Sequence, residues 1–195
     1  MKKDIIVINN FYEDPYAIRD FALSQTFPLL DNFPGQRTVG VPDDMSNELK
    51  NKFEEILGLE FPDWQPMRKR GQVHNTCFQL ITEGTQNWVH HDETAWAAVV
   101  YLTPEPDPDS GTGFFKHIAT GIDEWSPNDA TTEIYDYDEA FDHSKWNCTL
   151  EIKNQFNRAI IFPGTYYHSS MVSGFGRNYI EGRLIQVFFF GEKLC

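Results

Sequence analysis

Hydrophobic and polar positions alternate in short segments over the second half of the chain, and this pattern predicts β-strands. Each segment is rich in β-branched or aromatic residues and is bounded by Gly, Pro, Asn or Asp. One further short strand is predicted near the start, at residues 5–8. The six segments of the second half cover residues 73–81, 95–102, 112–117, 148–153, 158–162 and 183–190.

Two earlier segments have helical rather than strand-like spacing. Asp14 and Pro15 form a typical N-cap and first-turn pair, so a helix is predicted from there to about Ser24. A second helix is predicted over roughly 46–57, because its apolar positions recur at helical spacing and Gly58 follows where a C-terminal glycine belongs.

This succession of elements predicts a mainly β (α+β) fold. Many short strands after two helices are typical of two antiparallel sheets in a sandwich or jelly roll, with helices packed on one side. We expect one domain over residues 1–195, with a helical flank at 1–70 and a β core at 71–195.

Residues 118–147 interrupt the strands with a long acidic segment. It carries eight acidic residues against one lysine, together with five aromatic residues. One interpretation is a solvated insertion whose aromatic side chains hold it to the core, and the other is a lid or substrate-recognition flap. The sequence favours the first, because nothing in it places the segment beside a site.

Composition and charge narrow the classes of function. The 195 residues are 41% hydrophobic and 15% aromatic, which predicts a folded protein. The net charge of −13 would repel phosphate backbones and anionic lipids, so we expect neither nucleic-acid nor membrane partners. No apolar run approaches the roughly 20 residues of a membrane span, and the apolar stretch at 5–8 is too short for a signal peptide. We therefore expect a cytoplasmic protein.

The cysteines do not indicate a disulfide framework or a thiolate zinc site. There are three, an odd number, and none of them stand in C-x-x-C spacing. We expect each to be a small buried or terminal residue.

A cluster of histidines and acids precedes one predicted strand, where residues 88–102 read WVHHDETAWAAVVYL. Residues two apart on an extended chain point to the same face. His90 and Asp92 therefore form one pair, and His91 and Glu93 form another that should face away. A bulge in the backbone would instead bring the second pair to the site. Either pair offers one imidazole and one carboxylate to an ion.

A third ligand must come from elsewhere, and His168 is the best candidate. It follows the predicted strand at 158–162 and lies where that strand gives way to a loop. His74 and His117 fall in strand patterns and His143 falls in the acidic segment, so these are expected to be ordinary histidines.

Two imidazoles and one carboxylate with open positions form the ligand set of non-haem Fe(II) oxygenases. Three protein ligands on one face of an octahedron leave three positions for a chelating cosubstrate and O₂. Zinc hydrolases commonly carry H-E-x-x-H on a helix, which this sequence lacks. H-x-D alone is a weak signal. Its weight here comes from the strand after it, the later histidine, and a basic residue that opens a final apolar strand.

With these features the chain resembles the 2-oxoglutarate- and Fe(II)-dependent dioxygenases, most closely their prolyl-4-hydroxylase-like branch. The resemblance covers roughly residues 73–190, and NFPGQRT at 32–38 has no role in it. VHHDETAWAAVVYL is similar to the H-x-D and its strand, and SGTGFFKH to the following turn, although the second glycine is displaced. AIIFPGTYYHSS is similar to the strand before the distal histidine, and RLIQVFFF to the last core strand.

The resemblance implies a double-stranded β-helix, or jelly roll, with the metal between its two sheets at one open end. It implies that His90, Asp92 and His168 bind Fe(II) and that 2-oxoglutarate chelates this ion. It also implies that O₂ is consumed while a substrate is hydroxylated and succinate and CO₂ are released. The substrate would be an amino acid, a peptidyl residue or another small molecule.

In this family a basic residue after the distal histidine pairs with the far carboxylate of 2-oxoglutarate. Arg177 lies nine positions after His168, and Arg183 lies fifteen after it. We expect Arg183 to bind the cosubstrate, because a strand holds a guanidinium rigidly for bidentate pairing. Arg177 is the alternative, or could contact substrate. Tyr101 could bind the same carboxylate or be a core tyrosine.

A different class of function fits the same fold. The chain could be a catalytically silent cupin-like domain with a binding or structural role. Retention of all three candidate ligands and an arginine favours the enzyme.

Overall fold

The strands of the protein form two antiparallel sheets and a short separate ladder. The computed structural model describes residues 4–30, 33–62, 64, 68–69, 72–73, 75–134 and 137–194. Short 3₁₀ helices lie at Pro108–Ser110, Ala130–Thr132 and His143–Lys145. The other elements are β1 (Ile6–Ile8), α1 (Pro15–Ser24), β2 (Gln36–Arg37), α2 (Asp43–Leu57), β3 (Arg68–Lys69), β4 (Gln72–Val73), β5 (Cys77–Ile81), β6 (Thr94–Tyr101), β7 (Thr112–His117), α3 (Tyr137–Phe141), β8 (Trp146–Ile152), β9 (Ala159–Phe162), β10 (His168–Ser170) and β11 (Arg183–Lys193).

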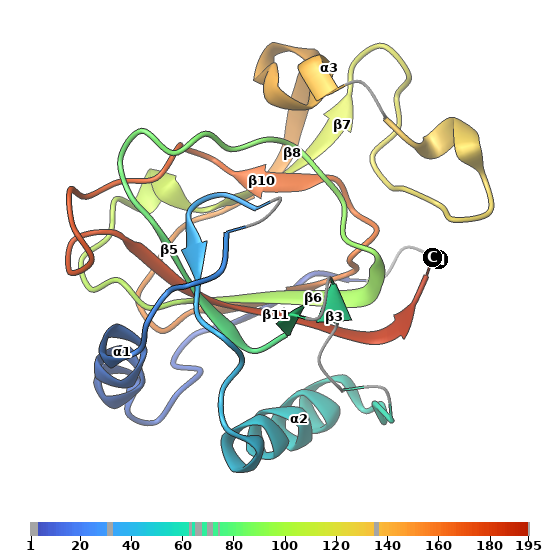
Figure 1. The fold of residues 1–195 in the computed structure, drawn as a ribbon. Helices are drawn as coiled ribbons and strands as arrows, with labels where there is room; N and C mark the ends of the chain where they lie inside the picture. The colour runs from blue at the N-terminus through green and yellow to red at the C-terminus, as the bar shows by residue number, and fades with distance from the viewer. Residues whose placement is uncertain are drawn as a thin grey trace.

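The larger sheet has six strands in the order β1-β9-β6-β11-β5-β2, and the smaller has three in the order β10-β7-β8. Helices α1 and α2 lie on one side of the larger sheet, and the smaller sheet lies on the other (Figure 1). This arrangement confirms the predicted jelly roll with helices flanking one side. None of the helices in the described residues is long and apolar enough to cross a bilayer.

Alternation along β11 separates two hydrophobic clusters. Leu184 and Phe188 point to the helix side, where they pack in one cluster with Phe53 of α2. Ile185 and Val187 point to the other face and pack with residues of both sheets. Because side chains of a strand alternate between faces, the same strand closes the helical layer and lines the interior. Residues 183, 185, 187 and 189 accordingly share the face of β11 that lines the interior.

Both predicted helices exist, and the first begins as expected. The Asp14 side chain accepts a hydrogen bond from the Ala17 backbone N–H at 3.0 Å, which caps α1. Helix α2 ends at Gly58, whose φ of 64° is left-handed. It begins at Asp43, three residues before the expected start, because two acidic residues in its first turn favour the positive end of the helix dipole.

One predicted strand was wrong in extent. The expected strand at 73–81 is divided, since β5 begins only at Cys77 and residues 72–73 belong to the ladder with β3. Thr76 has a φ of 63°, which no continuous strand can contain. His74 lies outside the described residues. Three short strands, β2, β3 and β10, were not predicted because none of them carries enough residues to show alternation.

Candidate metal centre

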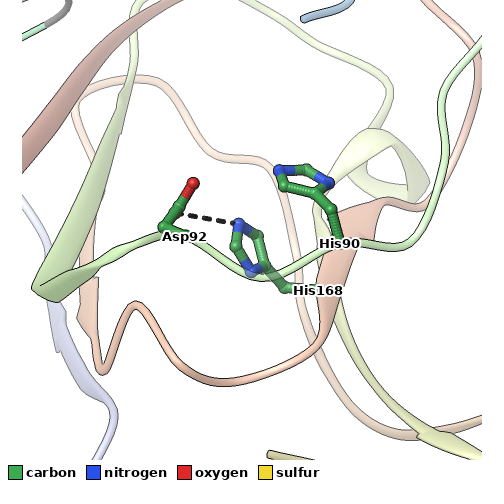
Figure 2. A group of neighbouring side chains, drawn as sticks. All are labelled: His90, Asp92 and His168. Carbon is green, nitrogen blue, oxygen red and sulfur yellow. Dashed lines mark ion pairs between the residues drawn. The ribbon is translucent and has the colours of Figure 1, made fainter. Parts of the chain in front are cut away.

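Three side chains from distant parts of the sequence meet at one end of the jelly roll. His90, Asp92 and His168 each offer one ligand atom, and these atoms all lie within 4.8 Å of one another. Nε2 of His168 lies 3.5 Å from Oδ2 of Asp92, and the two imidazole rings are 4.5 Å apart between centroids. Figure 2 shows the three side chains turned toward a common point. The sequence-based choice of these residues therefore agrees with their placement.

Backbone pairing fixes the distances between the ligands. His90 and His168 form an antiparallel bridge, with N–H···O bonds of 3.0 and 2.8 Å in the two directions. The Asp92 N–H donates to the Gly164 carbonyl at 2.7 Å. A Cβ on Gly164 would stand 2.2 Å from the Thr94 carbonyl oxygen, so only glycine allows this close approach. The ligand segments are thus tied to each other by main-chain contacts rather than by flexible side chains.

Each histidine is held in the tautomer that a metal requires. Nδ1 of His90 donates to the Trp88 carbonyl at 3.1 Å, and Nδ1 of His168 donates to the Tyr166 carbonyl at 2.8 Å. A carbonyl only accepts, so the proton of each neutral ring stays on Nδ1. Both Nε2 lone pairs are then available for a cation, which is the usual outer hydrogen-bond arrangement of a histidine ligand.

Burial keeps both imidazoles neutral. It lowers the pKa of His90 to about 4 and the pKa of His168 to about 4. Burial also raises the pKa of Asp92, against the lowering effect of the nearby His90 and Arg37. A bound cation would offset the cost of burying the charged Asp92 carboxylate, because it places a positive charge directly beside it. The donor set of two neutral imidazoles and one carboxylate therefore fits a divalent transition metal such as Fe(II).

The cluster opens into a cavity of about 480 Å³ between the two sheets. Arg183 lies in its wall, only 3% exposed, and its Nε donates to the Ser110 carbonyl at 3.1 Å. Burial lowers its pKa, against the effect of Tyr101. Among the described residues no carboxylate forms an ion pair with it, and a buried cation without a counterion is costly. The cavity therefore contains a position suited to an anionic ligand.

Tyr101 lies beside this arginine. The Arg183 Cζ is 5.6 Å from the centroid of the Tyr101 ring, and the Tyr101 hydroxyl is hydrogen-bonded to Oγ1 of Thr112 at 2.8 Å. Tyr101 is fully buried, and Thr112 lines the cavity. Tyr101 does not itself line the cavity, and its hydroxyl is connected to the cavity wall through Thr112.

Arg177 lies elsewhere. Its side chain is 88% exposed, its Nε is 3.9 Å from Oε2 of Glu83, and it does not line the cavity. The structure brings Arg183 into the cavity with the three candidate ligands and leaves Arg177 on the surface.

The expectation that His91 and Glu93 face away from the site was wrong. Both line the cavity. His90 forms only an isolated bridge, and the chain bends at Glu93 before β6 begins at Thr94, so residues 91–93 are not part of a continuous strand. His91 stacks on Trp125 at 4.3 Å and 6° between planes, and its Nε2 is 3.1 Å from Oε1 of Glu133.

The acidic segment at 118–147 lies beside the site. Trp125 and Glu133 line the cavity, and the Val89 N–H donates to the Ala140 carbonyl at 3.0 Å. Trp125 also packs in a cluster with Trp146 and residues of the body. The aromatic residues of the acidic segment therefore hold it to the core, as expected of a solvated insertion. Its position at the cavity also fits the alternative, a lid or substrate-recognition flap.

The remaining described histidines stay away from the cluster. Nε2 of His117 is 3.3 Å from Oε2 of Glu139, and the His117 ring lies 4.9 Å from Trp146. His143 contacts Phe115, at 5.7 Å between ring centroids. Neither lines the cavity.

Sequence reasoning missed one cavity residue of clear chemical interest. Arg37, on the two-residue strand β2, lines the cavity although it lies in the stretch NFPGQRT, to which no role was assigned. The local signal was the pair Pro34-Gly35 followed by an arginine, which is typical of a turn and says nothing of a site.

Comparisons with known proteins agree with the architecture. The sequence matches the model of a protein family described as "Family of unknown function (DUF6445)" over residues 1–190. No curated protein matches the sequence. HygX from Streptomyces hygroscopicus, crystallised with nickel and 2-oxoglutarate bound, is similar in structure with a TM-score of 0.57 and 12% identity, over 96% of this chain and 82% of that chain. A Pseudomonas putida prolyl-4-hydroxylase is similar with a TM-score of 0.50 and 16% identity, over 95% and 91%. These similarities confirm the fold that the resemblance to 2-oxoglutarate- and Fe(II)-dependent dioxygenases implied.

Proposed function

The chain belongs to the DUF6445 family, and we propose that it is a non-haem Fe(II)- and 2-oxoglutarate-dependent dioxygenase. The observation that carries the proposal is the meeting of two oriented imidazoles and one carboxylate at a cavity that also holds a buried arginine. An Fe(II) ion with 2-oxoglutarate and O₂ would supply the oxidation that hydroxylates a substrate and releases succinate and CO₂. The fold shared with a protein crystallised with 2-oxoglutarate supports this choice.

In this proposal His90, Asp92 and His168 hold the metal. Their Nε2 atoms and carboxylate oxygen are the donors that face the common point, and the backbone bridge keeps them in place without a bound ion. Pre-organised ligands lose little entropy on binding, which favours affinity.

Arg183 is proposed to bind the far carboxylate of 2-oxoglutarate. Its guanidinium is fixed by the Ser110 carbonyl and lies near Tyr101, and the Thr112 hydroxyl, which is hydrogen-bonded to that of Tyr101, is a further polar group on the same wall. Apolar side chains of β11 complete the wall and keep water away from the charged pair. A desolvated bidentate pair is strong and directional.

The substrate in this proposal is an amino acid, a peptidyl residue or another small molecule. The cavity of about 480 Å³ falls in the usual range for small-molecule sites. The net charge of −13 makes a nucleic-acid substrate a poor match.

The first experiment is anaerobic addition of Fe(II) and 2-oxoglutarate to the purified protein. The proposed ligand set should give a visible metal-to-ligand charge-transfer band, followed by succinate release in air. His90→Ala, Asp92→Ala and His168→Ala should each remove both signals, whereas His143→Ala, a change to a histidine outside the cavity, should keep them. Wild-type succinate release in all three ligand variants would disprove the proposal. Absence of the band at saturating iron would favour the silent binding domain.

A further inference from the structure

The segment at 33–37, FPGQR, places a second arginine in the cavity. Phe33, Pro34 and Arg37 all line it, and residues 36 and 37 pair with β5 at the free edge of the large sheet. Gly35 has a φ of 75°, and a Cβ there would stand 2.2 Å from the Leu80 carbonyl oxygen. Only glycine fits this turn, which carries the chain from outside the sheet to its interior face.

Several contacts hold the Arg37 side chain in one orientation. Its Nε donates to Oε1 of Gln79 at 2.8 Å, and Nε2 of Gln79 donates to the Pro34 carbonyl at 2.6 Å. The Arg37 Cζ lies 4.0 Å from the centroid of the Phe33 ring and 5.3 Å from that of Phe189. The residue is only 8% exposed. A guanidinium fixed between aromatic faces keeps its planar N–H donors in one plane, as recognition of a planar oxyanion requires.

The two cavity arginines occupy separate neighbourhoods. Arg183 lies against Ser110 and Tyr101, on the side of β6 and β7. Arg37 lies beyond β5, where it pairs with Gln79, and its guanidinium contacts the Phe189 ring. Different residues therefore hold the two guanidinium groups in the cavity wall.

Arg37 shares the cavity with the candidate metal centre. His90, Asp92 and His168 line the same cavity of about 480 Å³ as Arg37. A substrate held at Arg37 therefore lies in the space into which the three candidate ligands open.

We propose that Arg37 binds a carboxylate of the primary substrate and so selects small carboxylic acids, with free amino acids as the first class to test. The inference rests on the proposed function and adds to it the residue that binds the substrate's carboxylate. Glu93 and Glu133 line the same cavity, with Oε1 of Glu133 3.1 Å from Nε2 of His91 and Oε2 of Glu93 4.0 Å from Nζ of Lys193, so the wall carries acidic as well as basic groups. A substrate with a carboxylate and an ammonium group, as in a free amino acid, matches this mixture of charges.

The test uses Fe(II)-loaded protein under anaerobic conditions with saturating 2-oxoglutarate, so that Arg183 is already occupied. Free proteinogenic amino acids and simple aliphatic and aromatic acids are titrated in, each paired with its neutral carboxamide. Binding is followed by the change in the charge-transfer band and by thermal shift of the same protein loaded with Zn²⁺. At least one acid should bind, and its amide should bind about 10- to 100-fold more weakly, the range of a lost charge-assisted hydrogen bond.

Variants then assign the effect to the residue. Arg37→Met should reduce binding of that acid to the level of its amide while the band formed by 2-oxoglutarate persists. Arg37→Lys keeps the charge without the planar fork and should fall between the two. Lys116→Met removes one positive charge from an exposed position and should bind the acid like the wild type.

The possible outcomes separate the two proposals. If wild-type protein shows the band but no acid binds, or if acid and amide bind equally, the Arg37 assignment is overturned and the dioxygenase proposal stands. The same holds if Arg37→Met keeps full discrimination. If the wild type shows no band, the dioxygenase proposal fails and the assignment falls with it. The comparison of acid with amide needs no variant, so poor folding of Arg37→Met does not remove the test.

Discussion

Replacement of Arg183 should weaken 2-oxoglutarate binding while it leaves the fold intact. In Arg183→Met an apolar chain of similar length keeps the packing of the arginine stem, and only the guanidinium is lost. The residue is 3% exposed, and its only hydrogen bond among the described residues goes to the Ser110 carbonyl at 3.1 Å.

The size of the effect follows from burial. Removal of one partner of a buried charge pair costs about 3–5 kcal/mol, which corresponds to binding weaker by on the order of 10³-fold. The stability of the Arg183→Met protein without 2-oxoglutarate depends on two other contributions. The Ser110 carbonyl loses a donor, at about 1 kcal/mol, while the protein no longer buries an uncompensated cation. The two effects oppose each other, so the melting temperature should stay within about 2–4 °C of the wild type.

The assay is anaerobic calorimetric titration of 2-oxoglutarate into Fe(II)-loaded protein, with melting curves of the same samples without ligand. Arg183→Lys retains the charge but not the fork, so its affinity should lie between those of Arg183→Met and the wild type. Arg177→Met tests the alternative that the sequence left open. The reasoning is refuted if Arg183→Met binds 2-oxoglutarate as tightly as the wild type, or if Arg177→Met is the variant that loses binding.

Three further outcomes are expected. Gly164→Ala would place a Cβ 2.2 Å from the Thr94 carbonyl oxygen, so the backbone must shift, and the change should destabilise the protein by about 1–3 kcal/mol and weaken Zn²⁺ binding. Unchanged melting and unchanged metal titration would contradict the tight backbone contact. His91→Ala removes the ring stacked on the acidic segment, so hydrogen exchange measured by mass spectrometry should accelerate within residues 118–134 and not in β9; a uniform change would show general destabilisation instead. Burial raises the pKa of the Cys77 thiol to about 12, so at pH 8 only about one in 10⁴ of these groups is a thiolate. Iodoacetamide, followed by peptide mapping, should therefore modify the exposed Cys148 long before Cys77, and equal labelling would show that Cys77 is accessible.

The hydrophobic and polar pattern of the sequence was sufficient to predict most of the helices and strands. Helix α1 and strand β7 have the predicted bounds or nearly so, because a proline-led helix start and a run of β-branched and aromatic residues are local signals. The divided strand before Cys77 was missed, since a left-handed φ at Thr76 leaves no trace in hydrophobic alternation. The missed strands β2, β3 and β10 are too short for a period to appear.

The candidate metal ligands were accessible to sequence reasoning for a similar reason. His90 and Asp92 stand two apart before a strong strand, and His168 follows another, so spacing and order made them candidates and the resemblance to the dioxygenases implied their role. The side to which His91 points was not accessible. His91 lines the cavity with its ring stacked on Trp125 of the acidic segment, a contact far along the chain that no local pattern encodes.

The sequence by itself determined the class of fold, the alternation that gives β11 one face to the helices and one to the interior, and the three candidate ligands. Only the tertiary structure decided that Arg183 rather than Arg177 enters the cavity, that His91 lines it, and that Arg37 joins it through a pairing with Gln79, 42 residues away. Local periodicity specifies which way a side chain points within its own element. Which residues share a cavity depends on the register between distant strands, and on the close backbone contacts that hold that register.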